Sequence, residues 1–173
     1  IFNALHGKYG EDGQVQKLMD HFGVLYTGSR VFGAMLSMNK DYAKSELVKH
    51  GIKMAASITF NPELDEVDDF KEAVFRMMPP PWVAKPINSG SSVGVTLAYT
   101  LEDLSWALEK ALFHSERVMV EEYIRGREAT CGVVDDFRGI RHYSLPPIQI
   151  IKPKNRQFFD YTCKYDGTTK EIC

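Results

Sequence analysis

The sequence predicts an α+β protein in which mixed sheets are flanked by helices. Segments with helical spacing of apolar residues alternate with short strand-like runs over most of the chain. Two longer strand-like segments, 127–136 and 140–151, are joined by a short turn at 137–139 and predict an antiparallel ribbon. With 173 residues, 44% of them hydrophobic, the chain is long enough to bury a substantial core in one or two domains.

The first part of the chain predicts short strands and helices in alternation. Apolar residues recur with helical spacing in 14–22, and Gly23 ends that segment. Ser29 is placed to cap a further helix. We expect a strand end at 1–5, a glycine-rich loop at 6–13, a helix at 14–22, a strand and turn at 24–29, and helices at 31–38 and 41–50.

The middle of the chain predicts a second set of elements. The segment 65–78 begins with acidic residues, which suit the N-terminal end of a helix dipole. Thr100 and Asp103 form a T-x-x-D capping box before a leucine-rich helical pattern. We expect strands at 52–60, 82–86, 93–100 and 117–124, helices at 65–78 and 101–112, and mostly loop from Lys152 onward.

The segment VAKPINSGSSVGV (83–95) contains a glycine–serine loop between two of these strands. It is not a Walker A motif, because Lys85 precedes the glycines, and it is not G-x-G-x-x-G. Small residues at a hairpin tip leave backbone N–H groups able to cradle phosphate oxygens, and Lys85 lies at the adjoining strand end as a fixed cation. A flexible surface hairpin with an incidental lysine is the alternative.

Composition excludes several classes of function. The net charge of −2 gives no reason to expect nucleic acid or an anionic membrane as partner, and no apolar run is long enough to span a membrane. Cys131, Cys163 and Cys173 form no C-x-x-C pair, so neither a disulfide framework nor a zinc site is indicated. We expect a cytoplasmic protein. Because the chain starts at Ile1 within a strand-like run and stops after a polar one, we interpret it as a piece of a longer protein.

Seven segments occur in a characteristic order: LHGKYGEDG (5–13), YTGS (26–29), SMNK (37–40), VAKPINSGSSVGV (83–95), VEEYIRGREATCGV (120–133), LPPIQII (145–151) and FFDYTCKYDG (158–167). Together they resemble the D-alanine–D-alanine ligases of the ATP-grasp superfamily. The hairpin is general to ATP-grasp enzymes, whereas the first, fifth and last segments are specific to the ligases. The resemblance implies an ATP-grasp fold preceded by the end of an α/β N-terminal domain. It also implies ligation of two D-alanines through an acyl phosphate, with ATP and Mg²⁺, for peptidoglycan synthesis.

The resemblance assigns nucleotide contacts residue by residue. Lys40 and Lys85 resemble the two lysines on the ATP phosphates, although an ordinary solvated lysine is the alternative for Lys40. One of Glu121 and Glu122 is expected to face the nucleotide, because neighbouring strand residues point to opposite faces; two charges on an exposed edge strand are the alternative. The set of residues expected to bind nucleotide is Lys40, Lys85, Ser91, Ser92, Glu121, Glu122, Tyr123, Ile124, Glu128 and Lys164, with Glu128 on the ribose or, alternatively, in a cross-strand ion pair.

The residues that the resemblance implies in catalysis are His6, Ser91, Lys164 and Tyr165. Lys164 is expected to reach the transferring phosphoryl group, and Tyr165 to close the pocket of the first substrate. Lys44, by contrast, is interpreted as solvated charge on the same helix face as Lys40.

The resemblance also implies an organisation for the chain. Residues 1–40 correspond to the end of an N-terminal substrate-binding domain, 41–122 to the central ATP-grasp lobe and 123–173 to the start of the C-terminal lobe with its omega loop. Metal ligands are expected outside this chain, which alone is expected to be inactive, and the complete enzyme to be a homodimer. The alternatives are a D-alanine–D-lactate ligase, another ATP-grasp carboxylate–amine ligase, or an inactive nucleotide-binding fragment.

Overall fold

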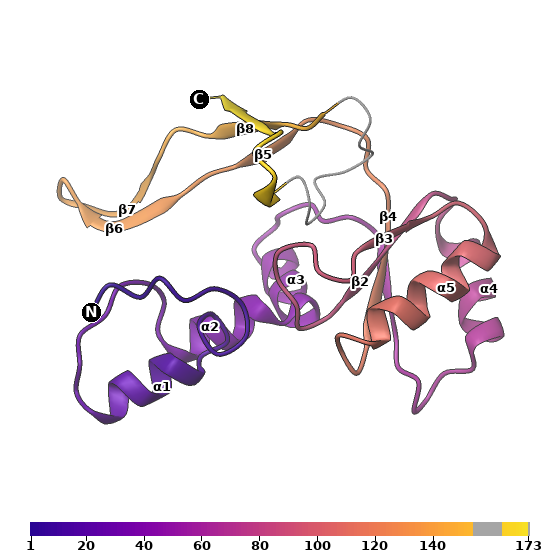
Figure 1. The fold of residues 1–173 in the computed structure, drawn as a ribbon, viewed down its shortest axis with the longest axis horizontal. Coiled ribbons are helices and arrows are strands. Elements are labelled where there is room, and N and C mark those ends of the chain that lie inside the picture. Colours follow the sequence, from indigo (N-terminus) through magenta and orange to yellow (C-terminus); the bar gives the residue numbers. More distant parts are fainter. Residues whose placement is uncertain (154–163, 173) are drawn as a thin grey trace. The chain divides into compact units, whose positions relative to one another are not determined.

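The computed structural model describes residues 1–153 and 164–172. The chain divides into two compact units after Tyr123, and each unit is considered over its described residues. Figure 1 shows the elements of each unit. The helices are α1 (Gln14–His21), α2 (Val31–Met38), α3 (Lys40–Lys49), α4 (Val67–Met77) and α5 (Leu101–Leu112). The strands are β1 (Ser57–Phe60), β2 (Trp82–Pro86), β3 (Thr96–Ala98), β4 (Val118–Glu122), β5 (Glu128–Thr130), β6 (Val133–Phe137), β7 (Ile140–Ser144), β8 (Ile148–Ile151) and β9 (Lys170–Ile172).

The first unit is built on a four-stranded antiparallel sheet in the order β1-β4-β2-β3. Helices α4 and α5 pack against it and lie side by side in Figure 1. Residues alternate along β2: Trp82 and Ala84 are buried in the core with Val74 and Leu108 of the two helices, because successive strand side chains point to opposite faces. Lys85 therefore lies on the face opposite that core.

Helix α3 is attached to this second face of the sheet. The hydroxyl of Thr59 on β1 donates to Asp41 at 2.6 Å, and Arg117 lies 3.5 Å from the other oxygen of the same carboxylate. Asn39 caps the helix by accepting from the backbone N–H of Tyr42. These contacts hold the first turn of α3 beside Lys85 and the end of β4.

Several local predictions are confirmed. Helix α1 occupies 14–21, and α5 begins with the predicted capping box, in which Thr100 accepts from the Asp103 N–H while Asp103 accepts from the Thr100 N–H. Strands β2 and β3 form the predicted hairpin, with Ala84 opposite Thr96. The α+β class is confirmed. Every described strand pair is antiparallel, so the expected mixture with parallel pairs is not found among them.

Other expectations about single elements are wrong. Neither 1–5 nor 24–29 is a strand, and Arg30 rather than Ser29 precedes α2, without a side-chain cap. The two segments do meet, since Thr27 donates its N–H to the Ile1 carbonyl at 3.0 Å. A pair with so few ladder bonds, and with no further strand beside it in the part of the chain that the structure describes, is too short to be a regular sheet.

The second unit contains the predicted ribbon in two parts. β6 pairs with β7 through a turn in which Arg138 and Gly139 have positive φ, as does Asp136 near the end of β6. β5 pairs with β8. The ribbon is interrupted where Pro146 and Pro147 follow β7, because proline has no N–H to donate to a ladder. The tail is not only loop, since β9 pairs with β8. No helix among residues 1–153 and 164–172 is long and apolar enough to cross a lipid bilayer.

Candidate functional site

The ammonium group of Lys40 is held by the chain that follows β2. It donates to the carbonyl oxygens of Pro86 at 2.7 Å, Ile87 at 3.3 Å and Ser89 at 2.6 Å. An ammonium has three N–H donors, so these carbonyls match its full capacity. Burial lowers the pKa of Lys40 to about 8; the nearby charge of Lys85 acts in the same direction and Glu121 opposes both. Lys40 is therefore a half-buried cation that ties α3 to the start of the β2–β3 loop.

The carboxylate of Glu121 lies between two further lysines. Lys44 donates to Oε1 at 2.8 Å, and Lys85 donates to Oε2. The side chains of Lys44 and Glu121 are each 13% exposed and that of Lys85 is 23% exposed, so the group is largely removed from water. Burial raises the pKa of Glu121, but Lys85 and Lys44 together outweigh it and hold the pKa below its ordinary value. Glu121 is thus ionised at neutral pH.

Positive charge is in surplus on this face of the sheet. Glu121 pairs with Lys44 and Lys85, and its charge also acts on Lys40, so three lysines share this one carboxylate. A partly buried excess of cations favours binding of an anion, because charge-assisted contacts are stronger where water is excluded. We call these four residues the lysine cluster.

The loop between β2 and β3 has an unusual backbone. Ser91 and Ser92 have φ of 51° and 58°, in the left-handed region that few residues other than glycine adopt. Gly94 has φ of 70°, and a Cβ there would lie 2.8 Å from both Pro86 and His114. Left-handed turns of this kind can direct successive N–H groups toward one anion. The loop and the lysine cluster adjoin, because Pro86 both ends β2 and accepts from Lys40.

Glu122 and Tyr123, at the end of β4 where the first unit ends, form hydrogen bonds to neighbouring backbone groups. Glu122 accepts from the Ala56 N–H at 2.9 Å and donates its own N–H to the Ala56 carbonyl. Tyr123 donates its N–H to the Pro81 carbonyl at 3.1 Å. Both strand-borne glutamates therefore have protein partners, Glu121 with lysines and Glu122 with a backbone amide.

The remaining expected residues lie apart from the lysine cluster or in the other unit. His6 is exposed and lies 3.9 Å from Glu11. In the second unit, Ile124 is exposed, Glu128 lies 3.5 Å from Lys152 across the β5–β8 pair, Lys164 is half-buried and Tyr165 is exposed. The first half of the FFDYTCKYDG segment, including Cys163, lies outside the described residues.

The interpretation of Lys44 as solvated charge is wrong. Its position four residues after Lys40 places both lysines on one face of α3, which the sequence does show. Nothing in the sequence identifies Glu121 as the partner, since 77 positions separate the two residues.

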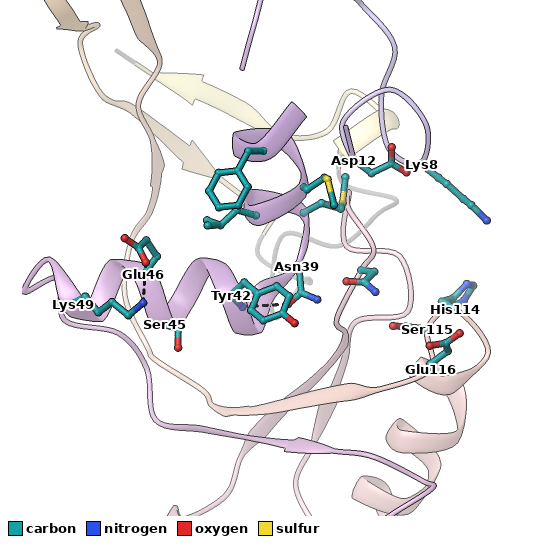
Figure 2. A pocket seen from close by; sticks show the side chains of 15 residues that line it. Lys8, Asp12, Asn39, Tyr42, Ser45, Glu46, Lys49, His114, Ser115 and Glu116 are labelled. Carbon is teal, nitrogen blue, oxygen red and sulfur yellow. Dashed lines mark hydrogen bonds and ion pairs between the residues drawn. The ribbon is translucent and has the colours of Figure 1, made fainter. Parts of the chain in front are cut away.

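A pocket of about 880 Å³ lies on the side of α3 opposite to Lys40 and Lys44. An α-helix repeats about every 3.6 residues, so positions 42, 45, 46 and 49 face away from 40 and 44. Figure 2 shows this side of the helix, and none of the four lysine-cluster residues lines the pocket. The labelled residues are Lys8, Asp12, Asn39, Tyr42, Ser45, Glu46, Lys49, His114, Ser115 and Glu116.

Asp12, on the pocket wall, shapes the glycine-rich loop before α1. It accepts from the N–H groups of Tyr9 at 2.8 Å and Gln14 at 3.1 Å. Burial raises the pKa of Asp12, but the hydrogen bonds from Tyr9 and Gln14 together outweigh burial and lower it overall. These bonds shape the loop, but no side chain caps α1, whose N-cap residue is Gly13.

Comparison with known proteins identifies the family. The family model described as "D-ala D-ala ligase C-terminus" matches residues 47–173. The D-alanine–D-alanine ligase of Chelativorans sp. (strain BNC1) is 36% identical over an alignment of 181 positions, which covers 99% of this chain and 52% of that protein. The chain spans about half the length of the curated relatives that it matches.

Two solved structures resemble the chain over 99% of its length. The D-alanine–D-alanine ligase from Bacillus anthracis is 33% identical with a TM-score of 0.74, and 52% of that chain is covered. The VanG D-Ala:D-Ser ligase from Enterococcus faecalis is 30% identical with a TM-score of 0.81, and 48% of it is covered. From the family match and these likenesses together, we conclude that the chain belongs to the D-alanine–D-alanine ligase family, within its ATP-grasp part.

Proposed function

We propose that the protein acts in the ATP-dependent ligation of two D-alanines to D-alanyl-D-alanine, through an acyl phosphate, for peptidoglycan precursor synthesis. The observation that carries the proposal is the lysine cluster beside the β2–β3 loop, in a chain of this family. Cations from α3 and β2 lie next to a loop with left-handed serines, which suits the phosphates of a nucleotide.

In this proposal the first unit binds the nucleotide phosphates. Lys85 and Lys40 neutralise phosphate charge, and Ser91 and Ser92 supply loop N–H groups. Lys40 exchanges at least one loop carbonyl for a phosphate oxygen, because its donors are already matched by three carbonyls. The loop and the first turn of α3 therefore respond together to the nucleotide.

We assign binding of the adenine and ribose to the segment from β4 to β5. Backbone groups from Glu121 to Ile124 serve the adenine edge, with Tyr123 as an aromatic wall, and Glu128 serves the ribose hydroxyls. The Glu121 carboxylate, whose two oxygens accept from lysines, acts on the phosphate side rather than on the base. This refines the role expected for Glu121.

The remaining roles concern the reacting groups. We assign Lys164 to the transferring phosphoryl group, Tyr165 to the first D-alanine and His6 to the neighbourhood of the dipeptide. The domain division at 1–40, 41–122 and 123–173 remains part of the proposal, as does a cytoplasmic homodimer. The limit between the compact units after Tyr123 supports the second boundary.

The described residues offer no metal centre. Among residues 1–153 and 164–172, no group of three or more His, Cys, Asp and Glu side chains is placed to hold an ion. Magnesium normally supplies charge neutralisation in phosphoryl transfer. We therefore assign no metal ligand among these residues.

Three compounds are candidates for the second substrate, the acceptor. The likeness to the VanG D-Ala:D-Ser ligase favours D-serine as a second candidate acceptor. D-lactate is a third, although a tyrosine at position 165 argues for the dipeptide. All three acceptors belong in the same assay.

The test is a product assay on the complete gene product, incubated with ATP, Mg²⁺ and D-alanine alone or with D-serine or D-lactate. We expect ATP-dependent phosphate release and D-alanyl-D-alanine identified by mass, with D-alanine the preferred acceptor. A preference for D-serine or D-lactate would reassign the acceptor. Nucleotide binding without any product would favour the inactive nucleotide-binding alternative and overturn the proposal.

A further inference from the structure

Lys44 belongs to the lysine cluster, but the function proposed above assigns it no role of its own. Its ammonium lies 2.8 Å from Oε1 of Glu121, and its side chain is only 13% exposed. The other oxygen of the same carboxylate accepts from Lys85. One carboxylate thus bridges a lysine of α3 and a lysine of β2.

We propose that Lys44 is a positioning residue for the nucleotide phosphates. It holds Glu121 in the orientation that places Lys85 beside the β2–β3 loop, and it keeps Glu121 neutralised when Lys85 turns to an anion. The inference rests on the proposed function, since it needs a phosphate to bind at Lys85.

Charge balance gives the reason for two lysines on one carboxylate. If Lys85 were the single partner of Glu121, a bound phosphate and a largely buried carboxylate would compete for one ammonium. Leaving a buried carboxylate without a partner is strongly unfavourable. With Lys44 on Oε1, Glu121 keeps an ion pair and Lys85 can direct its remaining donors to the phosphate.

A purely structural role for Lys44 is the competing explanation. Helix α3 is already fixed to the sheet by the Thr59–Asp41 hydrogen bond at 2.6 Å and to the loop by the three carbonyl contacts of Lys40. Loss of the Lys44 ammonium therefore leaves the helix attached. The two explanations differ in whether substitution changes phosphate affinity or only stability.

The experiment measures the affinity of the complete gene product for ADP and for adenosine, which has no phosphate. We expect Lys44→Gln to weaken ADP binding roughly tenfold, as loss of a charged contact predicts, and to leave adenosine binding unchanged. Lys44→Arg keeps the charge and is expected to stay within about twofold of wild type. Lys49→Gln is the matched control, because Lys49 lies on the same helix in an exposed pair with Glu46.

A double-variant cycle with Glu121→Gln separates positioning from direct contact. If Lys44 acts through Glu121, adding Lys44→Gln to Glu121→Gln changes ADP affinity by less than about twofold. A loss as large as in the wild-type background would mean that Lys44 contacts phosphate itself and would overturn the proposal. The double variant also removes both charges together, so it provides the comparison if Lys44→Gln alone does not fold.

The remaining outcomes are distinct. Unchanged ADP affinity in folded Lys44→Gln, with a lower unfolding temperature, would establish the structural role and overturn this inference alone. Equal weakening of ADP and adenosine binding would also overturn it, because the effect would not depend on phosphate. Absence of ADP binding by the wild-type protein would overturn the proposed function and this inference with it.

Discussion

The ammonium of Lys40 lies 2.6 Å from the carbonyl oxygen of Ser89, a residue 49 positions later in the chain. The contact joins the first turn of α3 to the loop that leaves β2. Because the contact depends on a charged donor, the protonation state of Lys40 affects both the loop and the binding of anions near it.

The lowered pKa of Lys40 predicts a pH dependence of nucleotide affinity. With a pKa of about 8, the ammonium loses its proton as the pH rises through that value, and a neutral amine no longer attracts phosphate. We expect the affinity for ADP to fall about tenfold between about pH 7 and about pH 9, measured by calorimetry. Lys40→Arg stays charged and should show a flat profile; a wild-type profile equally flat would contradict the prediction.

The same group predicts a trend in stability. The pKa of Lys40 lies below its ordinary value of 10.5, so between about 8 and 10.5 the unfolded chain binds more protons than the folded one. The free energy of unfolding should therefore rise with pH across this window, since the cost of burying the charge, fully present below it, is relieved. Subtracting the profile of Lys40→Met from that of wild type isolates this contribution. A difference that falls with pH would refute it.

Substitution of Lys85 tests the phosphate assignment. Lys85→Ala removes a cation beside the loop and leaves Glu121 with Lys44, and charged contacts of this kind contribute roughly 1.5–3 kcal/mol. We expect ADP affinity and turnover of the complete gene product to fall together, by about tenfold or more. Lys110→Ala, an exposed lysine of α5, is the control. Wild-type affinity and rate in Lys85→Ala would remove Lys85 from the site.

Alanine substitutions at two glycines of the β2–β3 loop should have different effects on stability. At Gly94 a Cβ would lie 2.8 Å from Pro86 and His114, and the φ of 70° is unfavourable for other residues. Gly94→Ala should destabilise the protein by about 1–3 kcal/mol. At Gly90 a Cβ would meet nothing within 4 Å, so Gly90→Ala should stay within about 0.5 kcal/mol of wild type. Chemical denaturation measures both, and equal losses would show that the loop geometry is not as described.

Hydrogen exchange tests whether the loop responds to nucleotide. We expect the amides of Ser91–Gly94 to exchange more slowly once ADP is bound, because phosphate oxygens accept from loop N–H groups and hold them closed. The buried strand segment Val118–Val120 is the internal reference and should not change. Loop exchange that is equally slow with and without ADP would argue against a phosphate-binding loop.

The sequence was sufficient where structure depends on neighbouring residues. The Thr100–Asp103 capping box and the β2–β3 hairpin involve short-range signals, and both were predicted. The alternation in β2 likewise predicts that Lys85 lies on the face opposite Trp82. Lys40, Lys85 and Glu121, expected to serve one nucleotide, do lie together in the first unit.

The sequence did not predict ion pairs between residues far apart in the chain, or strands whose formation depends on a neighbouring strand. Glu121 pairs with Lys85 and Lys44 across 36 and 77 positions, and no local pattern specifies such contacts. Segment 1–5 has strand-like composition, but among the described residues it has no neighbouring strand to complete a ladder. The polar segment 170–172, by contrast, becomes β9 because β8 offers an edge.

The strict alternation along β2 has an evolutionary consequence for relatives of this chain. A single-residue insertion or deletion between Trp82 and Lys85 would place the two residues on the same face of the sheet, so either Trp82 would turn outward or Lys85 would enter the apolar core. Point substitutions around the lysine cluster can accumulate one at a time, but length changes in β2 are compatible with the site only in steps of two residues. Lineages of this family should therefore vary in length at the loops on either side of the strand and keep its own length constant.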